Sequence, residues 1–136
     1  MTLKAVYDTN IIISAALSPS GMPSSLLAFA VDGTVQLYVS PVILEEYTEV
    51  LHRPKFALSE PVITGLMRRI TVAAVLVHPT RTLSASPDES DNRFLECAQE
   101  AGAAYVVTGN KRHFPFPEFE GITIVSPVEF ARILTE

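Results

Sequence analysis

The segment Leu3–Asn10, with the sequence LKAVYDTN, guides the interpretation of the whole chain. Its first part is short and apolar and predicts a buried strand over Leu3–Tyr7, with Asp8 directly after the strand. A short helix is predicted next, over Ile11–Leu17. An Asp in this place can cap the helix, although one of the two residues after it could do so and leave Asp8 free.

Outside this segment, apolar strands alternate with helices to the end of the chain. Further strands are predicted at 35–39, 73–77, 104–107 and 122–125. Helices are predicted at 23–31, 41–52, 60–69 or beyond, 91–101 and 127–134, and loops at 83–90 and 111–120. This alternation is typical of a parallel sheet with helices on both faces, and strands covered on both sides are apolar throughout. We expect one domain over residues 1–136, an α/β fold with a mostly parallel, five-stranded sheet.

In folds of this kind, ligands bind beyond the carboxyl ends of the strands. Asp8, Thr9 and Asn10 follow the first strand, and 108–110 follow the fourth. We therefore expect these two segments to line the site.

The helix predicted at 41–52 contains three glutamates, Glu45, Glu46 and Glu49. At about 100° per residue, only Glu46 falls within the apolar arc, between Val42 and Val50. A carboxylate on a core-facing side must be paired or bound to a cation, because burying it alone is costly. Periodicity therefore selects Glu46, although a Glu at the edge of the arc that reaches water or pairs with a base remains an alternative.

The helix predicted at 91–101 repeats this pattern. Asp91 lies near the middle of its apolar side, whereas Arg93, Glu96 and the residues at 99–100 are assigned to the polar side. A carboxylate in the first helical turn also suits the free backbone N–H groups there. Asp88 and Asp91 could form a variant of the capping box, which is the structural alternative for both. Capping does not by itself explain an acid on the core face.

Carboxylates gathered in this way suit Mg²⁺ or Mn²⁺, which take oxygen ligands and can activate water and stabilise a phosphate. The sequence has no Cys/His zinc spacing, no glycine-rich phosphate loop and no nucleophile elbow. The histidines, His52, His78 and His113, are scattered and are expected to be surface or structural residues.

Composition limits the class of protein. With 136 residues, 48% of them hydrophobic and 18% charged, the chain is expected to bury a core. We expect no membrane segment and no signal peptide, and the single Cys97 favours a reducing cytoplasm. The net charge of −5 counts mildly against a nucleic-acid partner, less so if the acids gather at a metal.

Four motifs, in this order and over nearly the whole chain, resemble those of the PIN-domain family, and most closely the prokaryotic toxins of the VapC type. They are Val6–Ile11 (VYDTNI), Ser40–Tyr47 (SPVILEEY), Asp88–Ala98 (DESDNRFLECA) and Val106–Lys111 (VVTGNK). The resemblance assigns the acids of the first three motifs to Asp8, Glu46 and Asp91. It implies a three-layer α/β/α fold, Mg²⁺- or Mn²⁺-dependent cleavage of RNA, and a homodimer neutralised by a cognate antitoxin.

One position departs from the family pattern, because the fourth motif usually has Asp where this chain has Asn110. An amide contributes no negative charge, and Asp88 is the candidate to supply it. The other polar residues of the motifs, Thr9, Asn10 and Thr108, are expected to orient the carboxylates or bind phosphate.

The main hypothesis is an endoribonuclease in which Asp8, Glu46 and Asp91 bind metal and a metal-activated water attacks the phosphodiester. The basic residues expected to hold RNA are Arg53, Lys55, Lys111 and Arg112, with a further pair at 68–69. A non-catalytic module that binds RNA or a protein is the alternative, favoured by Asn110 and the acidic charge. A phosphatase with Asp8 as nucleophile is less favoured, because such enzymes often have a second Asp two residues later. An apolar face at 22–29 or 62–67 is a candidate surface for the dimer or the antitoxin.

Overall fold

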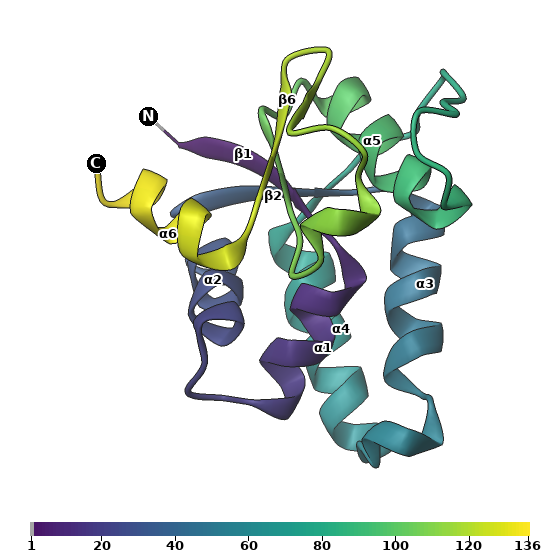
Figure 1. Cartoon of the computed structure of the whole chain (residues 1–136). Helices are drawn as coiled ribbons and strands as arrows, with labels where there is room; N and C mark the ends of the chain where they lie inside the picture. Colours follow the sequence, from purple (N-terminus) through teal and green to yellow (C-terminus); the bar gives the residue numbers. More distant parts are fainter. Residues whose placement is uncertain (1) are drawn as a thin grey trace.

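The computed structural model describes residues 2–136 and shows helices arranged around one six-stranded sheet (Figure 1). The strands are β1 (Leu3–Tyr7), β2 (Val35–Val39), β3 (Val75–Leu76), β4 (Tyr105–Val107), β5 (Glu118–Phe119) and β6 (Ile122–Val125). The α-helices are α1 (Thr9–Leu17), α2 (Met22–Val31), α3 (Pro41–Leu51), α4 (Glu60–Ala73), α5 (Glu89–Ala101) and α6 (Pro127–Leu134). Two short 3₁₀ helices, η1 (Pro54–Phe56) and η2 (Lys111–His113), follow α3 and β4.

The strand order is β3-β2-β1-β4-β6-β5, and every neighbouring pair is parallel except β5 with β6. The chain moves outward from β1 to β3 and then returns to β4 on the other side of β1. The direction of winding therefore reverses between β1 and β4, and a crevice for a ligand is expected at such a point. The predicted α/β fold with a mostly parallel sheet is confirmed.

The predicted number of strands was wrong, because β5 lies within the stretch expected to be a loop. It pairs with β6 through Glu118 opposite Thr123 and Phe119 opposite Ile122. The two connecting residues, Glu120 and Gly121, both have positive φ, 48° and 85°. Two such residues form a tight hairpin turn. The Phe- and Pro-rich composition of residues 111–120 did not predict this turn.

The third strand is shorter than expected. Helix α4 continues to Ala73 because its buried residues, Ile63, Leu66 and Ile70, keep helical spacing up to that point. Strand β3 consists of Val75 and Leu76, which pair with β2, and both are exposed at this edge of the sheet.

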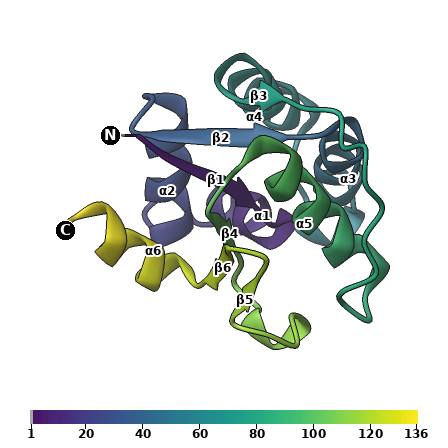
Figure 2. The same ribbon diagram turned by 90° about the horizontal axis from the view of Figure 1, so that it is seen from above.

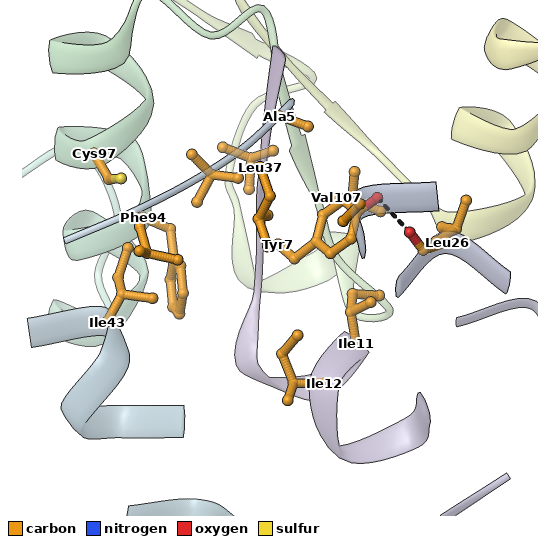
Figure 3. Close-up of a cluster of buried hydrophobic side chains, with 14 of the residues drawn as sticks. Ala5, Tyr7, Ile11, Ile12, Leu26, Leu37, Ile43, Phe94, Cys97 and Val107 are labelled. Carbon is orange, nitrogen blue, oxygen red and sulfur yellow. Dashed lines mark hydrogen bonds between the residues drawn. The ribbon is translucent and has the colours of Figure 1, made fainter. Parts of the chain in front are cut away.

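Helices cover both faces of the sheet. Figure 3 shows Phe94 and Cys97 of α5 on one side of β1 and Leu26 of α2 on the other. Tyr7 reaches the α2 side, where its hydroxyl donates a hydrogen bond to the backbone oxygen of Leu26 at 2.9 Å. Helix α6 packs against α2 (Figure 2), and its fully buried Phe130 contacts the ring of Tyr7 edge-on.

The helix that carries the second motif is held firmly at its start. The hydroxyl of Ser40 accepts a hydrogen bond from the backbone N–H of Ile43, and Pro41 occupies the first helical position. Tyr47 is fully buried and donates a hydrogen bond to the backbone oxygen of Tyr7. These contacts fix α3 beside the carboxyl end of β1.

Within residues 2–136, no single helix combines the length and the apolar character needed to cross a membrane. Helices α1 and α2 meet that criterion only together, as a pair bent by 107°.

Candidate metal centre

Two segments meet at the point where the sheet reverses its winding, as the strand-end rule predicted. Asp8 follows β1 and Thr108 follows the neighbouring strand β4. The hydroxyl of Thr108 donates a hydrogen bond to Oδ2 of Asp8 at 2.8 Å, and the backbone N–H of Asp8 donates to Val107. Both residues are buried, with Asp8 7% exposed. The carboxylate is thus held at the edge of the sheet by Thr108, a partner 100 residues away in the chain.

The side chain of Asn10 joins the two segments. Its amide nitrogen lies 3.3 Å from the hydroxyl of Thr108 and 3.4 Å from Oδ2 of Asp8, and its amide oxygen accepts from the N–H of Gly109 at 2.9 Å. Helix α1 has Asp8 at its N-cap position, but no side chain makes the capping bond. Capping therefore accounts for neither Asp8 nor Asn10.

Glu46 projects from α3 toward the same place. It accepts a hydrogen bond from the hydroxyl of Thr9, which is itself buried at the start of α1. Glu46 is partly buried, whereas Glu45 and Glu49 are exposed. The buried face of α3 is narrower than predicted, since Val42 is 45% exposed. Glu46 therefore lies at the edge of the core, where one oxygen is held and the group can still reach a ligand.

Asp91 has the lowest exposed fraction of the three acids, 4%, in agreement with the core-facing position predicted for it. Its Oδ2 has no hydrogen-bond partner within residues 2–136. The capping at this helix end falls to Asp88, whose Oδ1 accepts from the N–H and the hydroxyl of Ser90. The capping box considered as the structural alternative does not form, so capping does not account for the burial of Asp91.

Burial is the main cause of a raised pKa in all three acids, and neighbouring negative charges raise the pKa of Glu46 and Asp91 further. Burial raises the pKa of Asp91 to about 6, and the negative charges of Asp8 and Asp88 add to this effect. Burial also raises the pKa of Asp8, against the lowering effect of the Thr108 hydrogen bond. Burial is again the main cause for Glu46, whose pKa is raised further by the charge of Asp8. A bound divalent cation would relieve this repulsion, and carboxylate oxygens are the ligands that Mg²⁺ and Mn²⁺ prefer. The donor set therefore fits such an ion.

Asn110 and His113 complete this side of the site. The amide nitrogen of Asn110 lies 2.9 Å from Nε2 of His113. A ring nitrogen of His113 and carboxylate oxygens of Asp88 and Asp91 all lie within 4.8 Å of one another. His113 is exposed, as expected of a surface residue, but its position beside Asp88 and Asp91 was not predicted from the sequence. One feature of the sequence could have indicated this position. His113 lies three residues after Asn110, at the end of η2, which follows β4.

The basic residues surround the site unevenly. A hollow of about 460 Å³ lies beside the carboxylates, and Thr9, Glu46, Arg53 and Phe56 are among the residues that line it. Arg53 is exposed and pairs with Glu49 at 3.2 Å.

The remaining predicted RNA-binding residues are exposed. The Nζ of Lys55 lies 5.1 Å from the ring centre of Phe56. Lys111 is bonded to Glu129 at 2.9 Å, and Arg112 lies beside it in η2. Arg69 lines a different hollow, between α1, α2 and α4. The structure thus brings Arg53 to the edge of the carboxylate site and leaves Arg69 away from it.

Three matches describe what the chain is similar to among known proteins. The family model described as "PIN domain" matches residues 4–112. An uncharacterized protein of Methanocaldococcus jannaschii, MJ1680, is 31% identical over 112 residues, which cover 80% of this chain and 72% of that protein. Among solved structures, VapBC2 from Rickettsia felis, bound to a DNA fragment from their promoter, matches with a TM-score of 0.62 and covers 91% of this chain and 98% of that chain. At 12% identity, this last likeness concerns the fold alone.

Proposed function

Because the chain belongs to the PIN-domain family, whose model matches most of it, we propose that it is a metal-dependent nuclease that cleaves RNA. In this proposal, Asp8, Glu46 and Asp91 hold Mg²⁺ or Mn²⁺ at the carboxyl ends of β1 and β4. The observation that carries it is the buried carboxylate of Asp91, which lacks a hydrogen-bond partner within residues 2–136 and feels the charges of Asp8 and Glu46.

A metal held by these carboxylates would stabilise the charge on the phosphodiester and would activate a water for its hydrolysis. The neighbouring residues keep the carboxylates in position. Thr9 holds Glu46 by a hydrogen bond, and Thr108 with Asn10 holds Asp8. Such fixed partners mean that the acids need little rearrangement when the substrate arrives.

The hollow beside Glu46 is our candidate for the RNA path. Arg53 at its edge can exchange its partner Glu49 for a phosphate, and the ring of Phe56 offers a surface on which a base can stack. Lys55 lies close to that ring, and Lys111 and Arg112 are exposed on η2. Backbone contacts of this kind hold RNA without reading its sequence.

A toxin of a toxin–antitoxin pair is the biological role that we propose for this activity. The support is the likeness of the fold to a chain of VapBC2. A second hollow, of about 380 Å³, lies between α1, α2 and α4, and its apolar lining includes Leu27, Val62 and Leu66. Exposed apolar residues nearby include Met22 and Val31. We assign this face to a cognate antitoxin or to the second copy of a homodimer.

Two further parts of the proposal concern the whole chain. We propose that residues 1–136 act as a single domain and that the protein works in the cytoplasm. The free, buried thiol of Cys97 is consistent with a reducing compartment.

The proposal is tested by cleavage of a labelled RNA with Mn²⁺ and with an excess of chelator. We expect cleavage only with the metal, and an Asp8→Asn variant should lose about a hundredfold or more of it. Asp32→Asn is the matched control, because Asp32 is an exposed acid at the end of α2, outside the site. Full cleavage by Asp8→Asn would refute the assignment.

A non-catalytic module that binds RNA or protein is the second candidate. Asn110, in place of the usual acid, and the net charge of −5 favour it. Calorimetry distinguishes the two functions, since a non-catalytic module is expected to bind neither Mg²⁺ nor Mn²⁺ measurably.

A further inference from the structure

The loop after β4 contains the feature that the proposed function does not explain. Asn110 stands at the position of the fourth acid of the family, and its side chain lies against the imidazole of His113. An amide is a weaker metal ligand than a carboxylate and carries no charge. An imidazole nitrogen, in contrast, is a strong ligand for transition metals.

The surroundings of His113 contain both of the acids needed to complete a site. One carboxylate oxygen each of Asp88 and Asp91 and a ring nitrogen of His113 lie within 4.8 Å of one another. An acidic cluster alone is common on protein surfaces. Here, however, Asp91 is 4% exposed and its Oδ2 has no partner within the part of the chain that the structure describes. A buried carboxylate oxygen that lacks a donor is a candidate to bind a cation.

The position of His113 is tied to the helix that carries Asp91. Asn92, the next residue of α5, is 1% exposed and binds Ser86 twice: it accepts from the N–H of Ser86 at 2.7 Å and donates to its backbone oxygen at 3.0 Å. The hydroxyl of Ser86 donates to the backbone oxygen of His113 at 3.1 Å. The loop that carries His113 is therefore anchored to the start of α5 through Ser86.

We propose that His113 is a nitrogen ligand of a divalent metal held together with Asp88 and Asp91, and that it takes the place of the acid missing at residue 110. Asn110 then acts as a positioning residue, because its amide contacts Nε2 and can present either its nitrogen or its oxygen to the ring. A mixed nitrogen and oxygen site selects Mn²⁺ or a later transition metal over Mg²⁺, which prefers oxygen alone.

This inference rests on the proposed function, since it adds a ligand to the same carboxylate cluster. The experiment that tests it does not use RNA. The whole chain is loaded with Mn²⁺, and pulsed electron paramagnetic resonance measures whether a ¹⁴N nucleus couples to the bound ion. Calorimetric titrations with Mn²⁺ and Mg²⁺ then give the ratio of the two affinities.

We expect ¹⁴N coupling in the wild type and its loss in His113→Ala, with the affinity for Mn²⁺ reduced by about tenfold or more. His113→Asp should restore binding through oxygen and shift the preference toward Mg²⁺. His78→Ala is the matched control, because His78 is exposed and outside the cluster, and it should retain the coupling.

Absence of ¹⁴N coupling in the wild type would overturn the inference, and this measurement does not depend on whether a variant folds. Equal Mn²⁺ affinities of the wild type and His113→Ala would also overturn it. The outcome is separable from that of the proposed function. If ¹⁴N coupling is found but RNA is not cleaved, the proposed nuclease function is refuted and His113 remains a metal ligand. If RNA is cleaved but no ¹⁴N coupling is found, the nuclease function stands and His113 is not a ligand.

Discussion

Helix α5 carries two buried carboxylates with opposite surroundings, Asp91 in its first turn and Glu96 in its middle. They are 4% and 7% exposed. Glu96 accepts hydrogen bonds from the backbone N–H of Leu83 and from Arg93, both at 2.8 Å. Asp91 has an oxygen with no partner within residues 2–136 and lies among other negative charges.

The difference shows that burial alone does not identify a functional acid. A buried carboxylate with donors and a base around it stabilises the fold, and Glu96 thereby ties the loop at Leu83 to α5. A buried carboxylate without them raises the free energy of the folded state until a cation binds. The number of donors around each acid separates the two roles.

The largest expected effect is on RNA cleavage. Asp91→Asn should reduce it by about a hundredfold or more, because the proposed metal centre would lose one of its charged ligands. Glu96→Gln should leave the activity of the folded protein within about threefold, since Glu96 does not face the metal site. Rates measured with Mn²⁺ on one labelled RNA test this contrast. An equal loss in both variants would mean that the two acids do not differ in role.

The next effect is on stability without metal. Glu96→Ala should lower the free energy of unfolding by about 2 kcal/mol, because it leaves the buried N–H of Leu83 without its acceptor and leaves Arg93 with Glu89 as its remaining carboxylate partner. Asp91→Ala should cost less than this, since it removes repulsion together with a side chain. Urea unfolding in the presence of a chelator measures both. A larger loss in Asp91→Ala would contradict the assignment of structural and functional roles.

Metal binding should raise the free energy of unfolding of variants that keep Asp91 but not of variants that lose it. Mn²⁺ at about a hundred times its dissociation constant adds about 2–3 kcal/mol to a protein that binds it only when folded. We expect this gain in the wild type and in Glu96→Gln, and its loss in Asp91→Asn. Thermal unfolding with and without Mn²⁺ checks it, and a full gain in Asp91→Asn would exclude Asp91 as a ligand.

The smallest expected effect is on the pH dependence of stability without metal. The pKa of Asp91 is raised from 3.8 to about 6, so between these values the folded protein holds a proton that the unfolded chain has released. The free energy of unfolding should therefore rise as the pH falls from about 7 to about 5. Asp8 and Glu46 act in the same direction, because their pKa values are also raised.

Acids with a lowered pKa, such as Asp88 and Glu129, oppose this trend only at more acidic pH, where they become protonated. Asp91→Asn should flatten the slope above about pH 5 relative to the wild type. Urea unfolding at a series of pH values measures both slopes. A wild-type stability that falls over the same range would contradict the prediction.

Much of the fold followed from periodicity, because strands and helices with one buried face repeat their apolar residues at fixed intervals. The exceptions are pairings between segments. Strand β5 forms only because Glu120 and Gly121 turn the chain back onto β6, and β3 is short because α4 extends to Ala73.

The positions of the candidate site residues could be predicted to a similar extent as the fold. Asp91 and Asp8 were placed by a helical arc and by the end of a strand, and both are buried where expected. Glu96 was assigned to the polar side of α5, which was wrong, because the loop at Leu83 covers that side. His113 was not predicted, since its neighbours Asp88 and Asp91 are more than 20 residues away in the chain.

The sequence by itself therefore determined on which side of its own helix or strand each acid lies. The repeat of a helix or a strand fixes the direction of a side chain relative to its near neighbours in the chain. Only the tertiary structure decided which acids have partners. Asp91 and Glu96 are five residues apart on one helix, yet Arg93 and Leu83 satisfy Glu96, while Asp8 and Asp88 add negative charge around Asp91. Hydrogen bonds and Coulomb forces act over a few ångströms of space, and distance along the chain does not record which groups will lie that close.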